Sequence, residues 1–141
     1  MFAALEQAKI AISRDEVPVG AVLVKNKKII ASNFNRNRSL SDPTAHAEIL
    51  VIRESAKILG SHRLDGCDIY VTLEPCIMCA AAISLARIRR IYYSASDEKF
   101  GAVESGFFTK TSSCYHRPEI YSGFCEKDSA LLLKNFFEKK R

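Results

Sequence analysis

The amino-acid sequence predicts an α/β protein, a three-layer α/β/α sandwich around a five-stranded mixed sheet. The first observation is that β-rich runs alternate with runs of helical periodicity, which favours helices that pack on a sheet. The second is that only the polar segment Lys25-Asn26-Lys27 separates the first two β-rich runs, which indicates an antiparallel hairpin. Because 141 residues suffice for one core and not for two, we expect a single domain over 1–141.

The first half of the chain is expected to contain two helices with the hairpin between them. Apolar side chains recur every three or four residues at both ends of this half, and Pro18 and Gly60 interrupt the two patterns. In order, the expected elements are a helix over 2–13, strands over 19–24 and 28–32, a polar loop over 33–44 and a helix from 45 to Gly60.

The second half is expected to alternate strands and helices. A helix that begins at Pro75 consists almost entirely of small and apolar residues, so we expect it to be buried. Residues 95–118 are expected to form a long functional loop with one short helix. The remaining elements are a strand over 68–73, a helix over 76–87, strands over 90–94 and 119–122, and a helix over 127–139.

Composition narrows the class of protein. Lysine and arginine total 21 against 16 acidic residues, and this charge of +5 favours contact with phosphate. No apolar run approaches the roughly 18 residues that cross a bilayer, and the first residues lack a signal-peptide core, so we expect a cytoplasmic protein without a membrane. The odd number of cysteines, five, argues against a disulfide framework and favours metal binding or catalysis.

Two short segments carry residues suited to a metal centre. They are His46-Ala47-Glu48 and Pro75-Cys76-Ile77-Met78-Cys79. Zinc binds imidazole nitrogen and thiolate sulfur, and a set of three protein ligands leaves a fourth position open, as catalytic sites require. We therefore expect His46, Cys76 and Cys79 to bind one Zn²⁺ per chain. The start of a helix also favours the thiolate form of the cysteines.

Glu48 is expected to be the catalytic residue beside this metal. Residues two apart in a mature helix point in nearly opposite directions, so His46 and Glu48 share a site only if they lie at the first turn. Thr44 is a plausible cap for that turn. Glu48 can then take a proton from water and deliver it to a ring nitrogen and a departing amine, which requires a pKa above that of a free carboxyl group.

Two other interpretations of the cysteines remain open at this point. Cys76 and Cys79 could be a redox pair, as a Cys-x-x-Cys sequence in an α/β protein can be. A structural zinc site would need a fourth ligand, for which Cys67 is the nearest candidate. The strand over 68–73 spans about 20 Å, however, and places Cys67 at its far end.

These segments also resemble those of a known family. Pro43-Thr44-Ala45-His46-Ala47-Glu48 followed by Thr72-Leu73-Glu74-Pro75-Cys76-Ile77-Met78-Cys79 is similar to the signature of the cytidine/deoxycytidylate deaminase superfamily, whose zinc enzymes deaminate bases. Within it, the chain resembles the bacterial tRNA-specific adenosine deaminases over nearly its full length. Further matching segments are 17–22, 95–99, Gly101-Ala102, Leu131-Leu132 and Phe136-Phe137.

The resemblance implies an activity and a set of contacts. It implies a homodimer that converts adenosine to inosine at the wobble position of a transfer RNA, with the anticodon stem-loop as its partner. It further implies substrate-binding roles for Asn35, Asp97, Lys99 and Phe137. Without the resemblance, Asn35 could stabilise a turn, Asp97 and Lys99 could be solvated, and Phe137 could belong to the core.

Two other functions remain open on the sequence alone. The same fold can deaminate a free nucleobase or nucleoside of the guanine or cytosine type, although such an enzyme needs no basic surface. The chain could also be a non-catalytic RNA-binding subunit that keeps the metal. Glu48 argues against the second, because a subunit without catalysis has no chemical need for that carboxylate.

Overall fold

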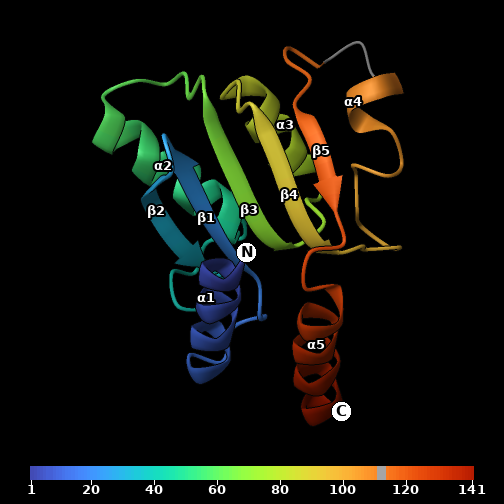
Figure 1. Ribbon diagram of the computed structural model, residues 1–141. Helices are drawn as coiled ribbons and strands as arrows, with labels where there is room; N and C mark the ends of the chain where they lie inside the picture. The colour runs from blue at the N-terminus through green and yellow to red at the C-terminus, as the bar shows by residue number, and fades with distance from the viewer. Residues whose placement is uncertain (111–113) are drawn as a thin grey trace.

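The computed structural model describes residues 1–110 and 114–141 and contains one five-stranded mixed sheet (Figure 1). In the order β2-β1-β3-β4-β5, β1 is antiparallel to β2 and β3, whereas β3, β4 and β5 are parallel. The strands are β1 (Gly20–Lys25), β2 (Lys28–Phe34), β3 (Cys67–Leu73), β4 (Arg90–Ala95) and β5 (Glu119–Ser122). The predicted mixed sheet is therefore confirmed.

Helices cover both faces of this sheet, as the sequence predicts. Figure 1 shows α1 and α5 on one side of the sheet and α2 and α3 on the other. The short α4 lies beside β5 at the edge of the sheet. The helices are α1 (Phe2–Ser13), α2 (Ala47–Leu59), α3 (Ile77–Leu85), α4 (Phe107–Lys110) and α5 (Glu126–Lys140). Among the described residues, none of them is long and apolar enough to cross a membrane.

The hairpin and the main core follow from local sequence. Asn26 and Lys27 adopt left-handed φ angles of 49° and 63°, which form the two-residue turn that matches the twist of paired strands. Lys25 pairs with Lys28, so the turn is one residue shorter than the segment expected. The core fills the space between the sheet and α2 and α3, with fully buried side chains that include Leu23, Val51, Ile69, Val71, Ile83 and Ile91.

Two expectations about helices are wrong. Helix α2 begins two residues later than expected, with His46 at its N-cap position but no capping hydrogen bond from that side chain. The Thr44 hydroxyl donates to Asp42 Oδ1 (2.7 Å) instead of capping the helix. Helix α3 is not wholly buried, since Ile77 is 68% exposed and Leu85 is 57% exposed. It lies at the outside of the sandwich, so only the side facing the sheet and α2 is covered.

The segment after β4 contains one short helix, α4, as expected. Of the long loop predicted over 95–118, residues 111–113 lie outside the described residues.

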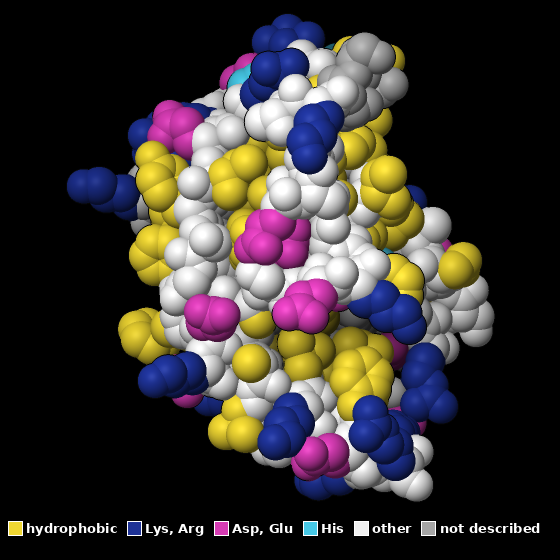
Figure 2. Space-filling model, turned by 90° about the vertical axis from the view of Figure 1, so that its right-hand side faces the viewer, with side chains coloured by type: hydrophobic (Ala, Val, Ile, Leu, Met, Phe, Trp, Pro, Cys, Tyr) yellow, Lys and Arg dark blue, Asp and Glu magenta, His cyan; other side chains and the backbone are white. Residues whose placement is uncertain are grey.

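The kinds of side chain at the surface vary along the face drawn in Figure 2. In the lower part of this view, at the level of α5, several Lys and Arg side chains and a few Asp and Glu side chains border a hydrophobic hollow. Exposed basic residues of α5 include Lys134 in its middle and Lys139 and Lys140 in its last turn.

Candidate metal centre and active site

The candidate site forms where three strands end at one edge of the sheet. Strands β2, β3 and β4 run in the same direction, because β1 is antiparallel to both β2 and β3, and β4 is parallel to β3. Asn35 follows β2, Glu74 follows β3 and Asp97 follows β4 within two residues. Ligand sites of open α/β sheets lie beyond such strand ends, so the topology itself assembles this one.

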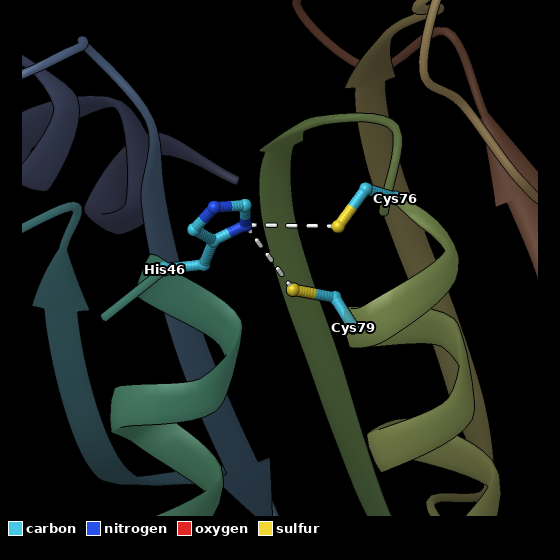
Figure 3. A group of neighbouring side chains, drawn as sticks. All are labelled: His46, Cys76 and Cys79. Atoms are coloured by element: carbon cyan, nitrogen blue, oxygen red, sulfur yellow. Dashed lines mark hydrogen bonds between the residues drawn. The ribbon is translucent and has the colours of Figure 1, made fainter. Parts of the chain in front are cut away.

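Three potential metal ligands meet at the starts of two helices. His46 is at the N-cap position of α2, Cys76 is at that of α3, and Cys79 lies in the first turn of α3. Figure 3 shows the imidazole of His46 pointing at both sulfur atoms. His46 Nδ1 lies 3.7 Å from Cys76 Sγ and 3.5 Å from Cys79 Sγ, and all ligand atoms lie within 4.8 Å of one another.

These distances fit a zinc ion. A tetrahedral site with ordinary zinc–nitrogen and zinc–sulfur bonds holds its nitrogen and sulfur ligands about 3.6 Å apart, close to both distances seen here. Cys67 begins β3, at the opposite end of the strand from Cys76. Among the described residues the centre therefore offers three ligands rather than four, which favours an open, catalytic site over a structural one.

The cysteines of this centre differ in acidity. The neighbouring Cys79 thiol, and the His46 imidazole after it, lower the pKa of Cys76 to about 4. The same contact raises the pKa of Cys79, whose side chain is also buried. The hydrogen bond to Cys76 raises the pKa of His46. One thiolate is thus already present at neutral pH, as a metal that binds sulfur requires.

Glu48 is the one residue of the motif that is placed to move protons. It lies in the first turn of α2, where the sequence required it to be, and is 3% exposed. Burial raises the pKa of Glu48 to about 7. Its Oε2 atom has no hydrogen-bond partner among the described residues. A carboxyl group that titrates near neutral pH can accept a proton and return it, as general acid–base catalysis requires.

A cavity of about 870 Å³ opens above these side chains. His46, Glu48 and Cys76 contribute to its lining, and the volume lies within the range typical of small-molecule sites. Its walls combine apolar residues such as Leu73 and Leu133 with a few polar ones. The arrangement can hold a flat, polar molecule against a metal centre and a proton carrier.

Comparison with known proteins identifies the family. A family model that describes MafB19-like deaminases matches residues 1–141. The chain belongs to the MafB19-like deaminase family. The tRNA-specific adenosine deaminase of Agrobacterium fabrum is 58% identical to it, with 100% of this chain and 93% of the relative covered. That of Rickettsia bellii is 53% identical, with 100% and 99% covered.

A solved structure agrees with this assignment. It comes from a study of A-to-I editing by tRNA deaminases at the wobble position of transfer RNA. It matches the present deaminase with a TM-score of 0.91 and 58% identity, over 94% of this chain and 97% of that chain. The resemblance recognised from the two motifs is therefore confirmed, as is the α/β/α fold that it implies.

All four of the expected substrate-binding residues line the cavity of the deaminase. Asn35 is 8% exposed, and its Oδ1 accepts a hydrogen bond from Ala47 N (2.8 Å), so it also stabilises the start of α2. Phe137 is 48% exposed and so does not belong to the core. Asp97 and Lys99 lie together on the loop after β4.

Asp97 and Lys99 differ in whether their side chains are already bonded within the protein. Oδ1 of Asp97 accepts hydrogen bonds from the backbone N–H groups of Lys99 and Phe100, both at 3.0 Å, so this carboxylate shapes its own loop. Lys99 is exposed, with its Nζ 5.1 Å from the ring centre of Phe100. Lys99 is therefore the member of the pair that is available to a phosphate.

Sequence reasoning missed two buried glutamates of the deaminase. Glu74 is 4% exposed and accepts hydrogen bonds from Asp97 N (2.9 Å) and Glu104 N (2.8 Å). Glu16 is 1% exposed and bonds two backbone N–H groups of the loop after β2. The available signal was an acidic residue in an apolar setting, such as Glu74 between Leu73 and Pro75.

Proposed function

We propose that this deaminase converts adenosine to inosine at the wobble position of a tRNA anticodon by hydrolysis. The observation that carries the proposal is the buried Glu48 beside His46, Cys76 and Cys79 in a cavity of about 870 Å³. The full-length similarity to tRNA-specific adenosine deaminases supports the choice of adenosine in RNA. We also propose that the deaminase acts in the cytoplasm, where a tRNA substrate would be met.

We infer that one Zn²⁺ is bound by His46, Cys76 and Cys79. When bound, zinc would act as a Lewis acid that lowers the pKa of water, so that water becomes a nucleophile at neutral pH. The chain itself supplies the ligands at two helix starts and leaves one side of the set open to the cavity. Zinc content is measured by atomic emission, and His46→Ala is expected to lower it.

Glu48 moves the protons of the proposed reaction. It takes one proton from the attacking water while the oxygen bonds to the ring carbon that bears the amino group. It then gives that proton to the ring nitrogen. It carries the second proton from the new hydroxyl group on the carbon to the amine, and the carbon–nitrogen bond breaks to release ammonia as the hydroxyl becomes a carbonyl. Burial raises the pKa of Glu48 to about 7, so near neutral pH the carboxyl group can both accept and donate a proton.

The anticodon loop would contact the rim of the cavity. Single-stranded bases are recognised by splaying them out and stacking them on aromatic or basic side chains. We assign such contacts to Asn35, Asp97, Lys99 and Phe137, which all line the cavity. The Lys and Arg side chains beside the hollow in Figure 2 favour binding of the phosphate backbone of RNA. Binding of an anticodon stem-loop should therefore weaken steeply as salt is added.

The deaminase is tested with purified, zinc-loaded protein and a tRNA that has adenosine at the wobble position. Inosine at that position, found by sequencing the reverse transcript, is the expected result. The alternative is a deaminase of free bases or nucleosides, which would release ammonia from guanine, cytosine or a nucleoside and leave the RNA unchanged. That outcome would agree with the proposed metal chemistry but would overturn the proposal that RNA is the substrate.

Glu48→Gln tests the proton carrier separately. Glutamine has nearly the same size but cannot accept and return a proton, so turnover should fall by about 10³-fold or more. Zinc content should stay at the wild-type level because Glu48 is not a ligand. Retained activity in Glu48→Gln would overturn the role assigned to Glu48, whereas loss of zinc would show that the variant disturbs the metal centre.

A further inference from the structure

The buried side chain of Glu74 holds both ends of the loop that forms one wall of the cavity. The buried Tyr93 hydroxyl adds a further hydrogen bond, to Oε1 of Glu104 (2.8 Å) at the far end of the loop. Each carboxylate oxygen of Glu74 accepts one backbone hydrogen bond: Oε2 from Asp97 N at 2.9 Å and Oε1 from Glu104 N at 2.8 Å. These two N–H groups lie seven residues apart, at the two ends of the loop. Lys99 and Phe100, which line the cavity, are between them.

The backbone of the loop folds closely around this carboxylate. Gly101 N donates to Asp97 O (2.9 Å), and Ala102 N donates to Pro75 O (3.0 Å). A Cβ atom at Gly101 would lie 2.2 Å from Glu74 Oε2 and 2.5 Å from Asp97 O. A side chain at position 101 therefore has no room, so the glycine and the carboxylate fit each other.

The same loop also contacts the helix start that carries the metal ligands. Gly101 forms an isolated antiparallel bridge with Cys76. A displaced loop could thus affect either the binding of a substrate or the metal centre, and the two effects differ in an experiment. Loss of contacts made equally in the ground state and the transition state raises KM, whereas a damaged centre lowers kcat and the metal content.

We propose that Glu74 is a positioning residue for substrate binding. Its carboxylate holds the loop over 97–104 in the conformation in which Lys99 and Phe100 meet the nucleotides that flank the target adenosine. This inference rests on the proposed RNA substrate. It differs from a general structural role because it requires the loop to affect binding of RNA while the fold and the metal centre stay intact.

Glu74→Gln is the variant that tests this role. A glutamine side chain has one acceptor oxygen and an NH₂ group that cannot accept, so either Asp97 N or Glu104 N loses its partner. For a hydrogen bond to a charged group, that loss is expected to raise KM for an anticodon stem-loop about tenfold. The value of kcat should stay within about threefold of wild type, with full zinc content.

Asp68→Asn is the matched control. Asp68 is also a buried carboxylate and accepts two hydrogen bonds, from Arg89 Nε (2.9 Å) and Nη2 (2.8 Å), but it lies in β3 at the end far from Glu74. This variant should lose stability without a change in KM. Glu74→Asp keeps both acceptor oxygens and should recover part of the affinity, which keeps the test available if Glu74→Gln folds poorly.

Three results would overturn the role of Glu74. They are an unchanged KM in Glu74→Gln, an equal rise of KM in Asp68→Asn, or a fall of kcat together with loss of zinc. Amide hydrogen exchange provides a readout that needs no activity, since Asp97 N and Glu104 N should exchange faster only in the Glu74 variants. If the wild-type protein makes no inosine in RNA, the proposed function fails, and the exchange result still tests the attachment of the loop.

Discussion

Asn35 combines a structural contact with a place in the cavity, and the two can be separated. Its Oδ1 accepts a hydrogen bond from Ala47 N, while the amide NH₂ group is left to meet a substrate. Asn35→Asp keeps an acceptor for Ala47 N, at a helix start that favours negative charge, but removes the donor. We expect the free energy of unfolding to stay within about 0.3 kcal/mol of wild type and KM to rise about tenfold.

Asn35→Ala is the control for this prediction. It removes both the acceptor and the donor, so it should lower the free energy of unfolding by about 1 kcal/mol and also raise KM. Urea denaturation and steady-state kinetics on one RNA measure the two quantities. A wild-type KM in Asn35→Asp would mean that Asn35 serves only the helix start.

The residues of the site differ in how far the sequence could predict them. The grouping of His46, Cys76 and Cys79, with Glu48 at the same cavity, was predictable because a metal site with a proton carrier would need particular side chains at particular spacings. Glu74 was not, since its partners are backbone N–H groups that every non-proline residue possesses. A contact of this kind depends on where the loop returns in space, which the sequence pattern does not record.

Helix α1 depends on a close approach to β1 at Gly20. A Cβ atom there would lie 2.1 Å from Ala4 O and 2.6 Å from Ala8 N, both backbone atoms of the helix. Gly20→Ala must therefore move the helix or the strand, and we expect a loss of about 3 kcal/mol in the free energy of unfolding. Urea denaturation measures it, and a loss below about 1 kcal/mol would contradict the close approach.

Gly60→Ala is the matched control at the end of α2. Gly60 has a φ of 64° and no heavy atom within 4 Å of an added Cβ, so the cost is conformational alone. For an alanine in this left-handed conformation that cost is about 1 kcal/mol. The difference between the two variants thus separates a steric clash from backbone strain.

The elements themselves were predicted more accurately than their ends. Strand β5 and helix α1 have the bounds expected, whereas α3 is shorter than expected at both ends. Its C-terminal limit follows from Arg87, which takes a positive φ of 57° and so cannot continue the helix. The start of α2 was missed for a similar local reason, because Thr44 bonds to Asp42 and leaves the N-cap position to His46.

At the scale of the whole molecule, the sequence predicted the fold class and the sheet because alternating periodicities determine the layers. The sequence did not predict that one side of α3 is exposed to solvent. Its residues are apolar all round, and such a pattern usually indicates burial. In this structure Ile77 and Leu85 are exposed at opposite ends of the helix. An exposed apolar surface of this kind is typical of a protein–protein interface.

We therefore propose that α3 lies at the interface of a homodimer, and Leu85→Glu tests this. Leu85 of α3 is 57% exposed, and Ile58 of α2 is equally exposed. Ile58→Glu is therefore a control with the same exposure on a different helix. A carboxylate buried between two apolar surfaces has no partner to offset its lost hydration, which should prevent association. Sedimentation velocity should show a dimer for wild type and Ile58→Glu and a monomer for Leu85→Glu. A wild-type monomer, or a dimer in all three, would exclude this surface as the interface.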